Sequence, residues 1–64
     1  MSSQADERAE ALRRLPPVYA TGLRLRDAGA TAGQIADELG IELESVGPLL
    51  TLAEAKLASV LADP

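Results

Sequence analysis

The chain has 64 residues, no cysteine, no histidine and a net charge of −4 at pH 7. This length allows one small domain, residues 1–64, and a domain of this size buries only about 60% of the surface that its unfolded chain exposes. Neither a disulfide nor a Cys/His zinc site can brace it, so a second copy or another protein is the natural brace. Because Tyr19 is the only aromatic residue, the core must be aliphatic.

The composition argues against catalysis. Without His or Cys, general-base work falls to a carboxylate, and nucleophilic work falls to Ser, Thr or Tyr. Asp37 and Glu38 are adjacent, so on a helix they point about 100° apart and cannot share a proton. The five glycines stand in separate contexts and form no phosphate-binding loop. We therefore expect no enzyme activity, no cofactor, no metal ion and no small-molecule substrate.

Two features that the sequence lacks bear on the location of the protein in the cell. No apolar run approaches the length of a membrane span. The chain also does not open with a basic segment followed by an apolar stretch, as a secretory signal would. These features predict a cytoplasmic protein with no membrane contact.

The first half of the chain predicts two helices. Apolar residues at helical spacing indicate a helix over residues 4–15, which Pro16 and Pro17 end because neither can donate a helical hydrogen bond. Pro17 suits the first position of a second helix that runs to residue 28. Gly29 then supplies the left-handed residue that ends this helix.

The second half predicts two more helices and no strand. Thr31 and Gln34 fit a capping box at the start of a short third helix, which Gly40 ends. After a linker over residues 41–44, Ser45 is the predicted cap of the last helix, with Pro48 in its first turn. One apolar stripe follows that helix: Val46, Leu49, Leu50, Ala53, Leu57, Val60 and Leu61. The predicted fold is therefore an all-α, four-helix domain.

Residues 31–62 have the layout of a helix-turn-helix. The pattern is a short capped helix with Ile35-Ala36, then Leu39-Gly40-Ile41, four variable residues, Val46 and Leu49-Leu50. Upstream stand Leu12, Leu15-Pro16-Pro17, Leu23, Leu25-Arg26, Gly29 and Thr31. Over about residues 10–61 the chain resembles region four of bacterial sigma factors. That resemblance implies a transcription module whose last helix enters the major groove of promoter DNA and which also contacts RNA polymerase.

The positions that correspond to the groove-facing residues of that family lack base-reading side chains. Arg or Lys typically contacts guanine, and Asn or Gln contacts adenine. This chain instead has Glu42, Leu43, Glu44, Gly47, Pro48 and Thr51 there. Glu54 stands where the family often has a basic residue. Because carboxylates oppose the phosphate charge, these six residues predict a partner surface more readily than a DNA surface.

Charge is divided unevenly along the chain. Residues 1–26 carry five arginines against three acids, a balance of +2, whereas residues 27–64 carry Lys56 against seven acids, a balance of −6. The favoured interpretation of the arginines is a solvated face with pairs such as Glu10 with Arg13. The alternative is a patch that contacts phosphate or an acidic partner: Arg13, Arg14, Arg24 and Arg26.

Several apolar residues stand where the family usually has polar ones. Val18, Tyr19, Leu43 and Leu52 either form an apolar interface or are buried by a slightly different helix packing. The role of Gly22 is also open. Either Gly22 allows two helices to cross closely, or it simply makes its helix about 1 kcal/mol less stable than Ala would.

Three functions fit these observations. The leading hypothesis is a helix-turn-helix module in transcription control that works by protein contact, with itself as a homodimer, with a sigma factor or with RNA polymerase. The alternative is a direct DNA-binding regulator that uses the N-terminal arginines for phosphate contacts. The third is a structural assembly subunit, since fold alone does not fix function.

Overall fold

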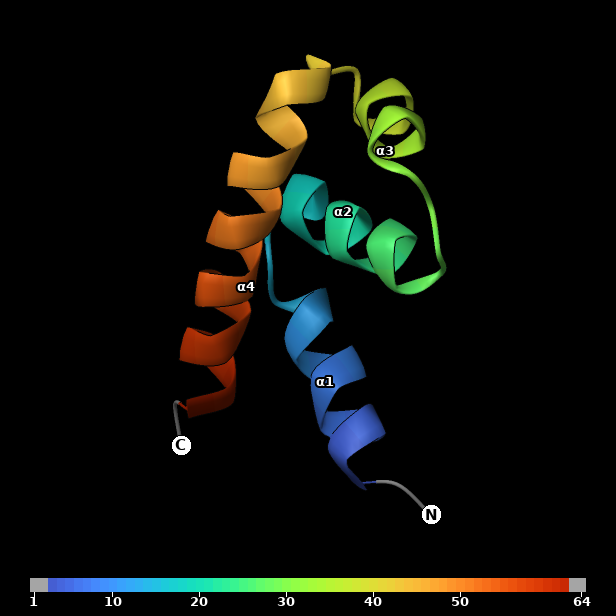
Figure 1. Cartoon of the computed structure of the whole chain (residues 1–64). Helices are drawn as coiled ribbons and strands as arrows, with labels where there is room; N and C mark the ends of the chain where they lie inside the picture. The colour runs from blue at the N-terminus through green and yellow to red at the C-terminus, as the bar shows by residue number, and fades with distance from the viewer. Residues whose placement is uncertain (1–2, 63–64) are drawn as a thin grey trace.

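The computed structural model describes residues 3–62, and these residues form four helices and no strand. The helices are α1 (Ser3–Arg13), α2 (Pro17–Asp27), α3 (Ala32–Leu39) and α4 (Val46–Ala62), with a 3₁₀ turn, η1 (Leu43–Ser45), directly before α4. The other three helices all lie on one side of α4, the longest element (Figure 1). The prediction of an all-α, four-helix chain is confirmed.

Two prolines separate α1 from α2. Pro16 is extended, at φ −53° and ψ 145°, and Pro17 occupies the first turn of α2 as predicted. α1 ends at Arg13, two residues before the predicted end. The α conformation is sterically disfavoured for a residue that precedes proline, so a tight turn follows the last residue of α1. In that turn the amides of Arg14 and Leu15 each donate to a carbonyl three residues back.

The capping box of α3 is confirmed. Thr31 Oγ1 accepts from the Gln34 amide at 3.1 Å, and Gln34 Oε1 accepts from the Thr31 amide at 2.8 Å. Gly40 ends the helix at φ +66°, a left-handed conformation that glycine adopts without steric cost. Gly29 has φ +92° after α2, also as predicted. These local signals fix the length and the direction of α3.

The start of the last helix differs from the prediction. Ser45 is not its cap, because Ser45 lies inside the η1 turn and its amide donates to the Glu42 carbonyl at 2.9 Å. The extended residue that precedes the helical conformation is Glu42, at φ −69° and ψ 146°. The 3₁₀ turn therefore shortens the connection between α3 and α4. Pro48 still lies in the first turn of α4, where its missing N–H is tolerated.

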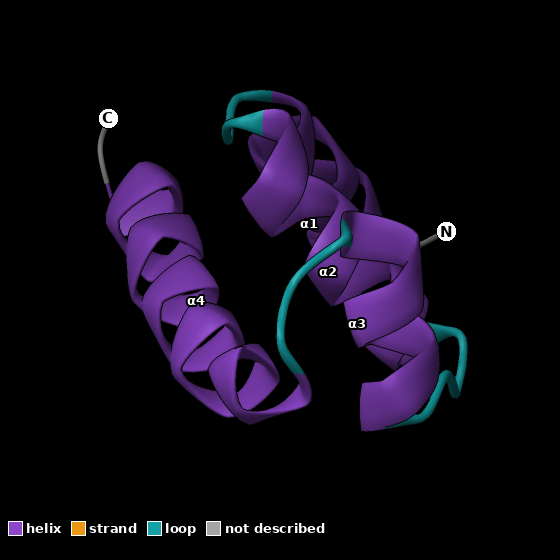
Figure 2. Ribbon diagram, turned by 90° about the horizontal axis from the view of Figure 1, so that it is seen from above, coloured by secondary structure: helices purple, strands orange, loops and turns teal. Residues whose placement is uncertain are grey.

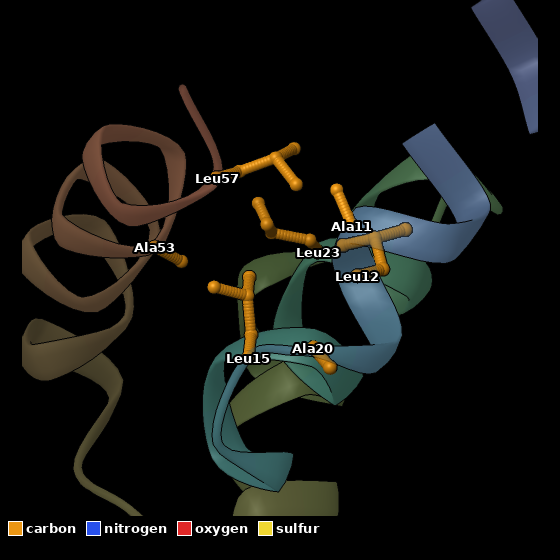
Figure 3. Close-up of a cluster of buried hydrophobic side chains, with 7 residues drawn as sticks. All are labelled: Ala11, Leu12, Leu15, Ala20, Leu23, Ala53 and Leu57. Carbon is orange, nitrogen blue, oxygen red and sulfur yellow. The ribbon is translucent and has the colours of Figure 1, made fainter. Parts of the chain in front are cut away.

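Two groups of buried side chains hold the helices together. The first joins α1, α2 and α4, as Figure 3 shows: Ala11, Leu12, Leu15, Ala20, Leu23, Ala53 and Leu57. The second joins α3 to the start of α4: Ile35, Ala36 and Val46. Leu50 packs against both groups. Leu61 departs from the predicted apolar stripe, since it is 47% exposed near the end of α4.

Gly22 of α2 faces two leucine side chains of α4. A Cβ atom at this position would lie 3.1 Å from Leu49 Cδ2 and 3.4 Å from Leu50 Cδ2. Such distances are shorter than ordinary carbon contacts, which begin near 3.5 Å. Of the two open interpretations, the structure favours the close helix crossing. The absence of a side chain at Gly22 leaves room for Leu49 and Leu50 of α4 to pack against α2.

The segment Leu43–Ala62 is, by length and composition alone, long and apolar enough to cross a membrane. The prediction that no apolar run approaches this length is therefore wrong for this segment, because its charged residues are few: Glu44, Glu54 and Lys56. In the fold, one face of α4 packs on the other helices through Val46, Ala53 and Leu57. Only 17% of the segment's most apolar window is buried.

The close crossing predicts that Gly22→Val destabilises the fold by about 1–3 kcal/mol, because a branched side chain there overpacks the contact with Leu49. The matched control is Gly33→Val, since a Cβ atom at Gly33 meets only Thr31 Oγ1, at 3.9 Å. Urea unfolding followed by circular dichroism measures both variants. Equal losses for the two variants would show that helix propensity, and not the crossing, decides the role of Gly22.

Candidate recognition surface

The six residues predicted to form the recognition surface are all exposed. Glu42 directly precedes η1, and Leu43 and Glu44 lie within it. The remaining three residues lie on the first turns of α4: Gly47, Pro48 and Thr51. Leu43 is the most exposed large apolar residue of the described chain, at 59%. The 3₁₀ turn continues directly into α4, so the six residues occupy one end of that helix (Figure 1).

This end of the molecule carries negative charge without a counterion from the chain. Glu42 and Glu44 are exposed, and so are Asp37 and Glu38 on α3. Within residues 3–62 none of these four carboxylates forms an ion pair. No Lys or Arg stands between Arg26 and Lys56 in the sequence. The resulting potential repels phosphate and attracts cationic groups.

Two of the four candidate arginines are engaged within the chain. Arg13 Nη2 lies 2.7 Å from Glu10 Oε1, the kind of pair expected from the sequence. The hydrogen bond from Arg13 lowers the pKa of Glu10. Arg26 pairs with Glu54 of α4 and lies 3.3 Å from Asp27. The hydrogen bond to Glu54 raises the pKa of Arg26. The ion pair with Glu54 connects Arg26 of α2 to α4.

The other two arginines have no ion-pair partner within residues 3–62. Arg14 and Arg24 are both exposed. Arg14 lines a groove of about 370 Å³ between α1 and the far end of α4, beside Val60 and Leu61. Leu61 lies about 20 Å along the helix axis from Pro48, at 1.5 Å per residue. Arg14 is therefore at the opposite end of α4 from the predicted recognition surface.

The four apolar candidates divide between two places. Tyr19 is half-buried against the first core group, and Lys56 Nζ lies 5.4 Å from its ring centroid. Leu52 is 47% exposed and precedes Lys56 by one helical turn, so Leu52 and Lys56 lie on the same side of α4. Val18 adjoins Tyr19 at the start of α2, whereas Leu43 belongs to the recognition surface. The four residues do not form one continuous patch.

A chain of ion pairs that the sequence did not suggest connects three helices. Arg8 of α1 lies 3.0 Å from Asp27 at the end of α2, and Asp27 also contacts Arg26, which reaches Glu54 of α4. Burial raises the pKa of Asp27, but the hydrogen bonds and charges of Arg8 and Arg26 outweigh it and hold the pKa below its ordinary value. Glu54 therefore forms an ion pair within the fold, at the position where sigma factors often have a basic residue.

The described residues show no metal-binding group, since no three metal-ligating side chains gather among residues 3–62. A second groove, between the end of α2 and α3, is lined mainly by small and acidic residues, including Asp37 and Glu38. No protein-family model matches this chain, and comparison with curated proteins and with solved structures also finds no match.

The lowered pKa of Asp27 predicts a stability loss in acid. A carboxylate whose pKa falls on folding stabilises the fold above its unfolded pKa of about 4, and this contribution disappears as the pH falls through the lower folded value. Unfolding midpoints between pH 7 and pH 2 measure the effect, and Asp27→Asn should give a shallower decline below pH 4. Parallel declines for wild type and variant would contradict the role of the Arg8–Asp27–Arg26 contacts.

The pair between Arg26 and Glu54 predicts a small, salt-dependent contribution. Both side chains are more than a third exposed, at 37% and 42%, so Glu54→Gln should cost at most about 1 kcal/mol at low salt. The cost should shrink at about 1 M salt, where screening is nearly complete. Glu38→Gln is the control, because Glu38 has no ion pair within the described chain. A cost that salt leaves unchanged would assign the effect to packing.

Proposed function

We propose that this chain is a non-catalytic helix-turn-helix module of transcription control, similar to region four of sigma factors, which acts in the cytoplasm mainly through protein–protein contact. The observation that supports this proposal is the charge of the recognition surface. Glu42 and Glu44 flank the exposed Leu43, and no cation within residues 3–62 forms an ion pair with them. The partner is a second copy, a sigma factor or RNA polymerase.

The chemistry of the surface favours a protein over DNA. A duplex presents closely spaced phosphates, and binding depends on cations that replace their counterions. Here the η1 turn would bring two carboxylates to the groove, while Gly47 and Pro48 offer no base-reading group. A protein surface with Lys or Arg around an apolar depression is complementary, because it pairs the carboxylates and covers Leu43.

Direct DNA binding is the alternative, and one observation favours it. Arg14 and Arg24 are exposed and have no ion-pair partner within residues 3–62. They could contact phosphates in a weak, sequence-independent manner. Such binding would not use the recognition surface, because Arg14 lies at the other end of α4.

Two binding assays distinguish these functions. Fluorescence anisotropy with labelled duplex DNA at low salt should show no saturable binding. Surface-immobilised protein should bind purified RNA polymerase core or sigma factor, and Glu44→Lys should weaken that binding about tenfold or more, since charge reversal creates a like-charge contact. Glu7→Lys is the matched control, because Glu7 is equally exposed but lies on α1.

Three results would contradict these expectations, and each would favour a different conclusion. Saturable DNA binding that falls with salt and disappears in the Arg14→Ala, Arg24→Ala double variant would establish the DNA-binding alternative. Equal weakening by Glu44→Lys and Glu7→Lys would show that the partner contact depends on net charge and not on this surface. Failure of both purified proteins to bind would restrict the protein contact to self-association.

A further inference from the structure

Two helix ends contribute little to the core. None of residues 5–10 of α1 is buried, and none of residues 58–62 of α4 is buried. These segments lie at one end of the molecule, to which neither α2 nor α3 extends (Figure 1). Seen from above, α4 stands on one side and the other three helices stand on the other (Figure 2). A helix of 11 residues is marginal in water by itself, so packing against another element would stabilise the start of α1.

The groove of about 370 Å³ lies between these two helix ends. Val60 and Leu61 of α4 give it an apolar wall, and Leu61 is 47% exposed. The wall from α1 carries both signs of charge, with Asp6 and Glu7 near the start of the helix and Arg14 directly after its end. These three charged side chains are exposed, and none of them forms an ion pair within residues 3–62.

The two signs of charge are separated along the groove. Asp6 and Arg14 are eight residues apart, which along a helix corresponds to about 12 Å and to a rotation of only about 80° beyond two full turns. Both residues therefore lie on the side of α1 that faces the groove, toward its opposite ends. Glu10 stands halfway between them in the sequence and is already paired with Arg13, at 2.7 Å.

We propose that this groove binds the same groove of a second copy of the chain. The inference rests on the proposed function by protein contact and names the partner. A two-fold axis sets the same surface of two copies together in reverse order. With the axis beside Glu10, Arg14 of each copy faces Asp6 and Glu7 of the other copy, and the exposed Leu61 side chains become covered.

The order of the charges selects this occupant. A basic segment would pair with Asp6 and Glu7 but would bring like charge to Arg14. An acidic segment, or the phosphates of a nucleic acid, would pair with Arg14 but would meet two carboxylates at the other end. An occupant that satisfies both ends must carry the same charges in reverse order. A two-fold-related copy carries that order without any further requirement.

The contact should be weak and sensitive to salt. Its ion pairs are formed by exposed side chains, and such pairs are screened by dissolved ions. A single groove against its own copy also gives an interface at the small end of the specific range. We therefore expect a dissociation constant in the micromolar range.

The pairing leaves the recognition surface accessible. Leu61 lies about 20 Å along α4 from Pro48, so Glu42, Leu43 and Glu44 stay outside the contact. A dimer would therefore present two acidic surfaces to basic partners. It would also occupy Arg14, which is one of the two exposed arginines that have no ion pair within residues 3–62.

The test is sedimentation equilibrium of the full chain over a concentration series. At low salt wild type should approach twice its mass of 6.7 kDa, and about 1 M salt should weaken the association by screening. Arg14→Glu should weaken it roughly 100-fold, because a carboxylate would then face Asp6 and Glu7 in both halves of the contact. Arg24→Glu is the matched control, since Arg24 is also exposed and without an ion pair within residues 3–62 but lies on α2, outside the groove.

An equal mixture of two charge-reversed variants gives the sharpest result. Asp6→Lys alone should also weaken the association, about tenfold, because its new cation faces Arg14 of the other copy. In a mixed pair, the carboxylate introduced at position 14 of one variant faces the cation introduced at position 6 of the other. The mixture of Arg14→Glu and Asp6→Lys should therefore regain twice the mass of one chain, and this recovery would show that both variants are folded.

Three results would overturn the inference. They are a wild-type mass of 6.7 kDa at every concentration, equal effects of Arg14→Glu and Arg24→Glu, and a mixture that is no heavier than its separate variants. The proposed function has a separate readout, since Arg14→Glu keeps Glu42, Leu43 and Glu44 for the polymerase and sigma-factor assay.

Discussion

The packing of α2 against α4 at Gly22 joins all four helices. Gly22 has no Cβ atom, so Leu49 and Leu50 can pack directly against the backbone of α2. This approach places Leu23 and Ala53 in full burial beside α1 and brings Arg26 within reach of Glu54. Leu50 extends the same contact to the group that holds α3. An aliphatic chain of 64 residues has few other means of joining four helices, because it has no disulfide.

The crossing also determines which charges remain available for binding. It directs Glu54 and Lys56 toward α2, through Arg26 and Tyr19, so the outer side of α4 stays neutral. The acidic residues of α3 and η1 are exposed and form no ion pair among the residues that the structure describes. One helix therefore presents an acidic end and a neutral side. We interpret the acidic end as a surface for a basic protein partner.

Local features of the sequence predicted the helices well, because their physical causes lie within a few residues. The Thr31–Gln34 capping box, the left-handed Gly40 and Pro17 at the start of α2 all act over one turn. The start of the last helix was harder to predict, because Ser45 lies within a 3₁₀ turn and not at the capping position. The pair of Arg26 with Glu54 spans 28 residues, and no local pattern identifies it. The exposure of the six recognition-surface residues could be predicted from the sequence, but the distance of Arg14 from that surface depends on the packing of α1 on α4.

The central claim is that the recognition surface contacts protein and not DNA. The most direct measurement is a titration of ¹⁵N-labelled protein with a short DNA duplex at low salt, in which amide chemical shifts report each residue separately. We expect the amide resonances of Leu43, Glu44 and Thr51 to keep their positions, with any shifts confined to the neighbourhood of Arg14 and Arg24. Saturable shifts at Leu43, Glu44 and Thr51 would contradict the account and would place this surface on DNA.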